Sequence, residues 1–289
     1  MNPGSTASAA ATGTTVLDGF SLEMTGKDIA GLDGARPVIP VGTRINVTFL
    51  GNEDLRMRLD AARAVKRLGF VPVPHISARR LPSRQALEQF LDGLRADGTC
   101  DDVFVIGGDP ASPHGPYPDA LSIIRDGLLQ AHGVRHVGIS GYPEGHPAIP
   151  EHELWGSLAD KYNELEAQGL SGSIITQFGF DSDAVLAWVR RVRECGIDLP
   201  VRVGVPGPAG VRRLLTFAAR FGVGTSTSIA KKYGLSLANL MGTAGPDKFL
   251  RALAAGYDPA VHGELKAHFY TFGGLKTTAE WAARFKEEG

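Results

Sequence analysis

The segment SIITQFGFD, residues 173–181, decides the fold because it joins a short apolar run to a helix start. The apolar run is typical of a buried strand. Asp181 is a residue type that begins helices, and valines recur behind it at helical spacing from Val185 to Val192. The segment therefore predicts a strand followed by a helix. Gln177 is either a solvated residue at the strand end or an amide that faces a pocket at the mouth of a barrel.

The same unit, an apolar run, a polar loop and an amphipathic segment, recurs along the chain. Strands that alternate with helices indicate a parallel sheet, and eight repeats favour closure into a (β/α)8 TIM barrel over an open doubly wound sheet. No GxGxxG pattern follows the first strand, which also disfavours the doubly wound fold. The eight predicted strands are residues 20–24, 44–49, 71–77, 102–107, 136–141, 172–178, 201–205 and 267–271.

Helix starts can be read between these strands. Pro82 and Ser83 mark one start, and Thr277 and Glu280 have the spacing of a capping box at the start of the last helix. Residues 226–256 are longer than one helix requires, so we expect extra short helices between the seventh and eighth strands.

Residues 1–18 are rich in Ser, Thr, Ala and Gly and cannot bury enough surface to offset their ordering entropy. We expect them to form a disordered tail, followed by a single barrel domain over residues 19–289. The first residues also lack the basic start and long apolar centre of a secretory signal.

Composition indicates a soluble globular protein, with 43% hydrophobic and 21% charged residues. A formal net charge of −1 provides no field that would attract nucleic acid or a membrane surface. No apolar run approaches the ~20 residues of a membrane span. Two cysteines are too few for a disulfide framework and are typical of a cytoplasmic protein.

Polar residues gather at the predicted carboxyl ends of the strands, where barrel enzymes place their sites. Glu23, His75, Asp109 and Gln177 come from four different strands, and other polar residues follow the fifth and eighth. Each alone is more readily explained as a loop or core residue, but independent surface residues would not converge on one face. Glycines at the end of the fourth strand and nearby aromatic residues favour a flat, ring-bearing ligand. No histidine or cysteine spacing indicates a metal site, and no GxSxG motif indicates a serine nucleophile.

Seven short motifs, in order, resemble the methylenetetrahydrofolate reductase family, in the short bacterial form. They are SLE (21–23), VTF (47–49), PHIS (74–77), GGDP (107–110), GYPEGHP (141–147), IITQFGFD (174–181) and HFYTF (268–272). The resemblance extends from residue 20 to about residue 281. It implies an enzyme that passes hydride from NADH or NADPH through FAD to 5,10-methylenetetrahydrofolate, giving 5-methyltetrahydrofolate.

The resemblance also implies roles for particular residues. Glu23 resembles the acid that protonates the folate, Asp109 the aspartate that orients folate and tunes the flavin, and Gln177 the amide that binds the pterin. Tyr270 and Phe272 resemble residues that face the substrate. Flavin-lining positions are implied at Thr48, His75, Gly107, Gly108, Asp109, Tyr117, Ser140, Tyr142, His146 and Lys161.

Departures from the family pattern concern the FAD phosphates. The family usually has a basic residue where Gly107 stands, and it has more basic residues than this chain on the helix before the sixth strand. Fewer cations predict weak FAD binding, for which Arg79 and Arg80 are candidates to compensate.

Alternatives remain. The chain could be another folate or pterin barrel, such as a methyltransferase, or a folate-binding paralogue without catalysis. The sequence does not distinguish NADH from NADPH, and exposed helices could pair in a homo-oligomer.

Overall fold

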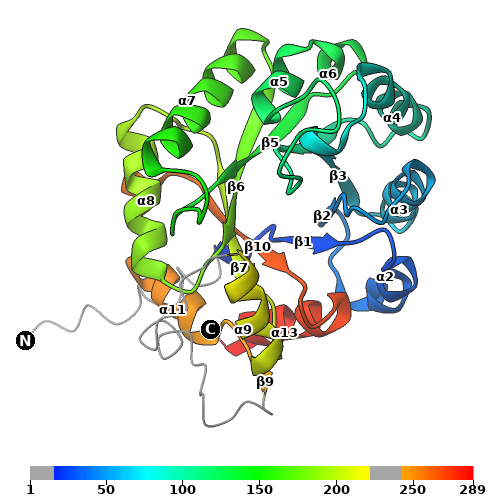
Figure 1. Cartoon of the computed structure of the whole chain (residues 1–289). Coiled ribbons are helices and arrows are strands. Elements are labelled where there is room, and N and C mark those ends of the chain that lie inside the picture. The colour runs from blue at the N-terminus through cyan, green and yellow to red at the C-terminus, as the bar shows by residue number, and fades with distance from the viewer. Residues whose placement is uncertain (1–15, 222–242, 289) are drawn as a thin grey trace, which may run out of the picture.

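A computed structural model describes residues 16–221 and 243–288. Within these residues eight parallel strands close into a barrel, in the order β1-β10-β7-β6-β5-β4-β3-β2 (Figure 1). The barrel prediction is confirmed, and the strand ends differ from the predicted ones by at most two residues. The strands are β1 Ser21–Met24, β2 Arg44–Val47, β3 Val71–Ser77, β4 Asp102–Ile106, β5 His136–Gly141, β6 Ser171–Phe178, β7 Val201–Pro206 and β10 Leu265–Tyr270.

Helices surround the strands in Figure 1 and bury the outward-facing apolar side chains. Five of them begin at side-chain caps: Asp54 accepts from Met57 N, Ser83 from Ala86 N, Asp119 from Ser122 N, Asp181 from Asp183 N and Asp258 from Ala260 N. The helices are α2 Ile29–Ala35, α3 Leu55–Arg67, α4 Arg84–Ala96, α5 Ala120–Arg125, α6 Leu128–Ala131, α7 Glu151–Ala167, α8 Ser182–Glu194, α9 Val211–Phe221, α11 Asp247–Gly256, α12 Pro259–His262 and α13 Leu275–Glu288, with 3-10 turns η1 Arg36–Val38 and η2 Ala78–Arg80.

The capping-box prediction for the last helix is wrong. Helix α13 begins at Leu275, so Thr277 lies inside its first turn. Its hydrogen bonding starts earlier because Leu275 is buried and anchors the apolar face of the helix at that point.

The predicted boundary of the tail is also wrong. Val16 and Leu17 are buried in the main hydrophobic core, because this apolar pair has enough surface to pack where the preceding small residues do not. The rest of the predicted tail lies outside the described residues.

A short ribbon between β7 and α11 was not predicted. Strands β8 (Ala209–Gly210) and β9 (Thr243–Ala244) pair antiparallel, and each is too short to produce a periodic pattern. Of the segment predicted to hold extra helices, α11 is described, and residues 226–242 lie outside the described residues.

Polar side chains fill the amino-terminal part of the barrel interior. Arg44 pairs with Asp102 at 2.7 Å, and His136 Nε2 lies 3.0 Å from Ser173 Oγ. Burial lowers the pKa of Arg202 to about 10, so this guanidinium still carries its charge at neutral pH. A polar, hydrogen-bonded layer therefore closes the barrel at this end. We look for a ligand site at the other end, where the carboxyl ends of the strands lie.

Candidate active site

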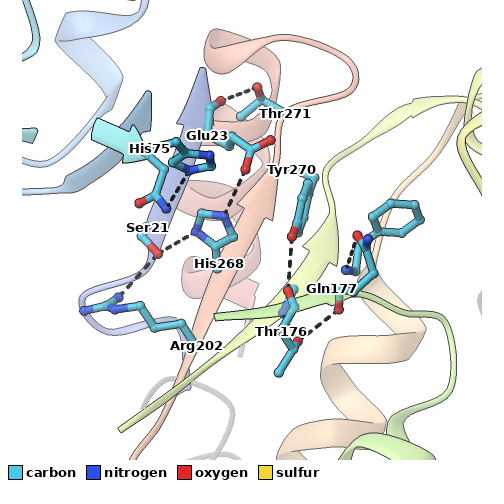
Figure 2. Close-up of polar contacts among 12 residues, drawn as sticks. Ser21, Glu23, His75, Thr176, Gln177, Arg202, His268, Tyr270 and Thr271 are labelled. Carbon is cyan, nitrogen blue, oxygen red and sulfur yellow. Dashed lines mark hydrogen bonds and ion pairs between the residues drawn. The ribbon is translucent and has the colours of Figure 1, made fainter. Parts of the chain in front are cut away.

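Glu23 stands at the carboxyl end of β1. Its side chain is 20% exposed, and Oε2 lies 3.7 Å from Nε2 of His268 on the neighbouring strand β10 (Figure 2). The backbone carbonyl of Glu23 accepts a hydrogen bond of 2.6 Å from Thr271 Oγ1. The backbone of Glu23 is thus fixed by its neighbours on β1 and β10, while its carboxylate reaches solvent.

A polar column continues from Glu23 into the barrel. His268 is fully buried, and its Nδ1 lies 2.9 Å from Ser21 Oγ. Arg202 Nη1 donates to that hydroxyl at 3.4 Å and to the carbonyl of Gly19 at 3.0 Å. Among the described residues, Nε2 of His268 has no hydrogen-bond partner and faces the Glu23 carboxylate. The arrangement leaves Nε2 of the imidazole 3.7 Å from the carboxylate, beyond hydrogen-bond distance.

His75, on β3, is buried next to this pair and is neutral at pH 7. Burial lowers its pKa to about 4, and the nearby Glu23 carboxylate only partly opposes that effect. Its Nε2 lies 3.3 Å from Nδ2 of Asn46, an amide nitrogen that can only donate. Nδ1 of His75 therefore carries the proton.

Tyr270 forms the other side of Glu23. Figure 2 shows it between His268 and Thr176, and its hydroxyl donates to the Thr176 carbonyl at 3.1 Å. Burial, then the Glu23 carboxylate, raise the pKa of the phenol well above its usual value, so it stays protonated. Its ring contacts Phe178 at 5.3 Å between centroids and Phe272 at 5.9 Å.

Gln177 lies in an irregular part of β6. The pairing of β6 with β7 shifts register between Ile175 and Phe178. Oε1 of Gln177 accepts from Phe178 N at 3.1 Å, while its Nε2 has no hydrogen-bond partner among the described residues. One lone pair of the amide oxygen is thus engaged by the local backbone, and the NH2 group is left for a ligand. Its role in pterin binding stays a prediction.

Asp109 follows β4 and extends toward solvent, with 67% of its side chain exposed. It forms an ion pair with Arg80, which follows β3. Between them, Gly108 has φ +93°, and a Cβ on it would overlap Ser77 Oγ. A Cβ on Gly107 would meet open space. Ser77 Oγ is buried without a hydrogen-bond partner among the described residues, as is the hydroxyl of Thr48.

The β5 loop brings Tyr142 and His146 together, with ring centroids 5.3 Å apart. Burial lowers the pKa of His146, and its Nδ1 accepts from Ala148 N at 3.2 Å. Ser140 lies near the end of β5, opposite Ile175 of β6. These positions face the same end of the barrel as Glu23.

Tyr117 and Lys161 lie in surroundings that do not favour contact with a cofactor. The Tyr117 hydroxyl donates to Asp126 at 2.7 Å, and burial raises the pKa of this phenol. Lys161, on α7, is buried, and burial outweighs the attraction of Asp119 to lower its pKa to about 8. Each would have to rearrange before it could bind a phosphate.

Sequence reasoning missed two parts of this site. Phe217, on α9, stacks on Phe272 with centroids 4.1 Å apart and extends the aromatic side of the mouth. Arg58, on α3, lies 3.6 Å from the ring centre of Phe49. Both occupy ordinary helical positions, and no local pattern distinguishes them from surface residues.

The described part of the chain contains no group of three or more His, Cys, Asp or Glu residues that could hold a metal ion. Nor does any helix in it have the length and apolar character required to cross a membrane.

The sequence of the chain is similar to those of known proteins. The sequence profile of the family described as "Methylenetetrahydrofolate reductase" matches residues 40–232. "Methylenetetrahydrofolate reductase 2" of Saccharomyces cerevisiae is 27% identical over 166 residues, or 55% of this chain and 26% of that protein. "Methylenetetrahydrofolate reductase 1" of Schizosaccharomyces pombe is 35% identical over 37% of this chain and 18% of that protein. "Methylenetetrahydrofolate reductase (NADH) 1" of Zea mays is 24% identical over 145 residues, or 45% of this chain and 24% of that protein.

The chain spans about a quarter or less of the length of these relatives. Among solved structures, dihydropteroate synthase from Thermus thermophilus in complex with 6HMPPP has a TM-score of 0.50 and 15% identity, over 93% of this chain and 92% of that one. That likeness concerns the barrel alone. Because the family profile covers two thirds of the sequence, the chain belongs to the methylenetetrahydrofolate reductase family.

Proposed function

We propose that the chain reduces 5,10-methylenetetrahydrofolate to 5-methyltetrahydrofolate with NADH or NADPH as the source of hydride. The observation that carries this proposal is Glu23, a carboxyl group at the barrel mouth that contacts both solvent and a buried histidine, in a chain of this family. Reduction of the folate requires its five-membered ring to open, and a proton donor at the ring nitrogen makes that opening easier.

Glu23 supplies that proton. His268 lies 3.7 Å from the carboxyl group on the barrel side, and the 20% exposed side chain of Glu23 is open to a ligand in the mouth. His75 stays neutral and adds no positive charge that would keep Glu23 ionised. Tyr270 provides an aromatic side against which a flat pterin can lie, and the free NH2 group of Gln177 can donate to a pterin acceptor.

The described residues fit the ring end of FAD better than its diphosphate end. At the ring end, the buried hydroxyls of Thr48 and Ser77 lack partners among the described residues, and a Cβ on Gly107 would meet open space. At the diphosphate end, Lys161 is buried and Arg80 is already paired with Asp109. The described residues therefore do not fit the FAD diphosphate as they stand, and the proposed roles concern only side chains of the protein. We expect purified protein to hold little flavin, measured by its visible absorbance, and added FAD to bind weakly.

Other parts of the proposal rest on simpler observations. Cys100 and Cys195 are both free thiols, which agrees with a cytoplasmic location. We propose no nucleic-acid or membrane partner, and a homo-oligomer stays a prediction. Selection between NADH and NADPH is left to measurement.

Oxidation of NADH and of NADPH with methylenetetrahydrofolate as acceptor tests the proposal, with menadione as a second acceptor. Consumption that depends on the folate supports a reductase. A methyltransferase would oxidise neither nicotinamide with either acceptor. A protein that binds methyltetrahydrofolate in a titration, but oxidises neither nicotinamide with either acceptor, would be a folate-binding paralogue.

A further inference from the structure

Arg80 is held rigidly at the mouth of the barrel. It ends the short η2 turn behind β3, and its side chain is only 15% exposed. Its guanidinium lies against Gly51, where a Cβ would overlap Nη1, and 6.0 Å from the ring centre of Phe49. Nε of Arg80 is buried and has no hydrogen-bond partner among the described residues. The guanidinium is therefore fixed in place with unused donor capacity.

Its partner is held far less firmly. Asp109 is 67% exposed and projects from the loop after β4, so that water can solvate its carboxylate when the pair opens. An exposed carboxylate loses little free energy on release, whereas the buried guanidinium requires some anion to replace it. The ion pair thus joins a fixed cation to an exchangeable anion.

Further unused donors surround this pair. Arg58 is 7% exposed, lies between the rings of Phe49 and Phe90, and has a buried Nη1 without a partner among the described residues. Thr48 Oγ1 and Ser77 Oγ, at the ends of β2 and β3, are also buried and, within the described ranges, unpartnered. Both oxygens of the nearby Glu53 are engaged, by Gly26 N at 2.7 Å and Leu50 N at 2.9 Å. The guanidinium N–H groups can only donate and the hydroxyls can donate as well, so these unpartnered groups could serve an oxyanion.

We propose that Arg80 is an anion anchor for a ligand of this active site and that Asp109 is its exchangeable counter-ion. The oxyanion of an incoming ligand takes the position of the Asp109 carboxylate on Arg80. Displacement also frees Asp109 to turn toward the bound ring system. Only the choice of ligand rests on the proposed function. The anion is either the diphosphate of a dinucleotide or a carboxylate of the folate glutamate.

Two fragments distinguish these sources by calorimetry. ADP-ribose carries the diphosphate without a nicotinamide or flavin ring, and p-aminobenzoylglutamate carries the carboxylates without a pterin. Arg80→Gln should weaken one of them about tenfold to one-hundredfold, as expected for loss of a charged donor to an anion. Asp109→Asn should tighten binding of the same fragment about two- to fivefold, because it removes the competitor.

Arg135 and Asp101 supply matched controls. They form the same type of ion pair, on the loops before β5 and β4 at the opposite end of the barrel, and both side chains are well exposed. Arg135→Gln and Asp101→Asn should leave binding of both fragments unchanged. Any general effect of removing one charge of a pair would be seen in these variants too.

The opposite results would overturn the inference. If Arg80→Gln binds both fragments as well as the parent chain does, Arg80 is no anchor. If Asp109→Asn weakens binding, the carboxylate assists the ligand rather than competing with it. Should Arg80→Gln fail to fold, as judged by circular dichroism, Arg80→Lys and Asp109→Asn carry the test. A chain that binds a fragment through Arg80 but reduces no folate would disprove the proposed function and leave this inference intact.

Discussion

Replacement of Glu23 by Gln separates proton delivery from every other property of the site. The amide has nearly the shape of the carboxyl group and can keep its place 3.7 Å from His268 Nε2. That distance exceeds a hydrogen bond, and His268 attracts Glu23 electrostatically only when protonated. We therefore expect the free energy of unfolding to change by less than about 1 kcal/mol.

The effect on catalysis should be much larger. A positioned general acid contributes about 10²- to 10⁴-fold to a rate. Loss of that contribution raises the barrier for folate reduction by about 3–5 kcal/mol. Because the proposed pterin contacts at Tyr270 and Gln177 are unchanged, KM for the folate should stay within a few fold, and the loss should be in kcat.

Steady-state oxidation of the preferred nicotinamide, with folate and then with menadione, measures this effect. Glu280→Gln is the control, since Glu280 is a solvent-accessible carboxylate on α13 that pairs with Lys276 on the same helix. Folate reduction should fall with Glu23→Gln alone, while hydride delivery to menadione continues. A Glu23→Gln enzyme that reduces folate within tenfold of the parent rate would refute the reasoning.

Three further predictions concern stability and the shape of the mouth. The pKa values of His75 and His136 are lowered to about 4 from 6.5, chiefly by burial, so the unfolded chain takes up their protons first on acidification. Stability should be full above about pH 6.5 and fall toward pH 4, by up to ~1.4 kcal/mol per pH unit for each histidine. Melting temperatures across this range measure it, and a protein that gains stability on acidification contradicts it. Phe178→Ala should cost about 3–5 kcal/mol in urea unfolding because the ring is fully buried among aromatic neighbours; a cost below about 1 kcal/mol would mean that the site collapses around the gap. Gly108→Ala should destabilise the chain by about 1–3 kcal/mol, since φ is +93° and the Cβ would overlap Ser77 Oγ. When Ser77→Ala is combined with Gly108→Ala, the chain should regain only the stability lost through the overlap with Ser77 Oγ. Full recovery of stability would argue against backbone strain at Gly108.

Much of the fold could be predicted because each strand carries its own apolar pattern and several helices begin at a residue with a local capping signal, such as Ser83 and Asp181. Closure of the barrel then explains long-range contacts that no local pattern contains. Ser21 and His268 are 247 positions apart, and they meet because β1 pairs with β10. The convergence of polar residues on one end of the barrel follows from the same parallel topology.

Details that depend on loop geometry could not be predicted. The use of Gln177 Oε1 by its neighbouring backbone N–H follows from a register shift in β6, which the apolar pattern of the strand does not encode. The pair of Arg80 with Asp109 depends on how two loops approach each other. Burial of Lys161 depends on which face of α7 meets the barrel, and the weak apolar pattern of that helix does not indicate the face.

Identification of the product tests the central claim most directly. Purified chain, methylenetetrahydrofolate and NADH or NADPH are incubated anaerobically, and folates are then analysed by mass spectrometry. We predict that 5-methyltetrahydrofolate accumulates in proportion to the nicotinamide oxidised, and that Glu23→Gln slows this accumulation about 10²- to 10⁴-fold. Absence of the product with both nicotinamides, with and without added FAD, in a chain shown to be folded, would contradict it.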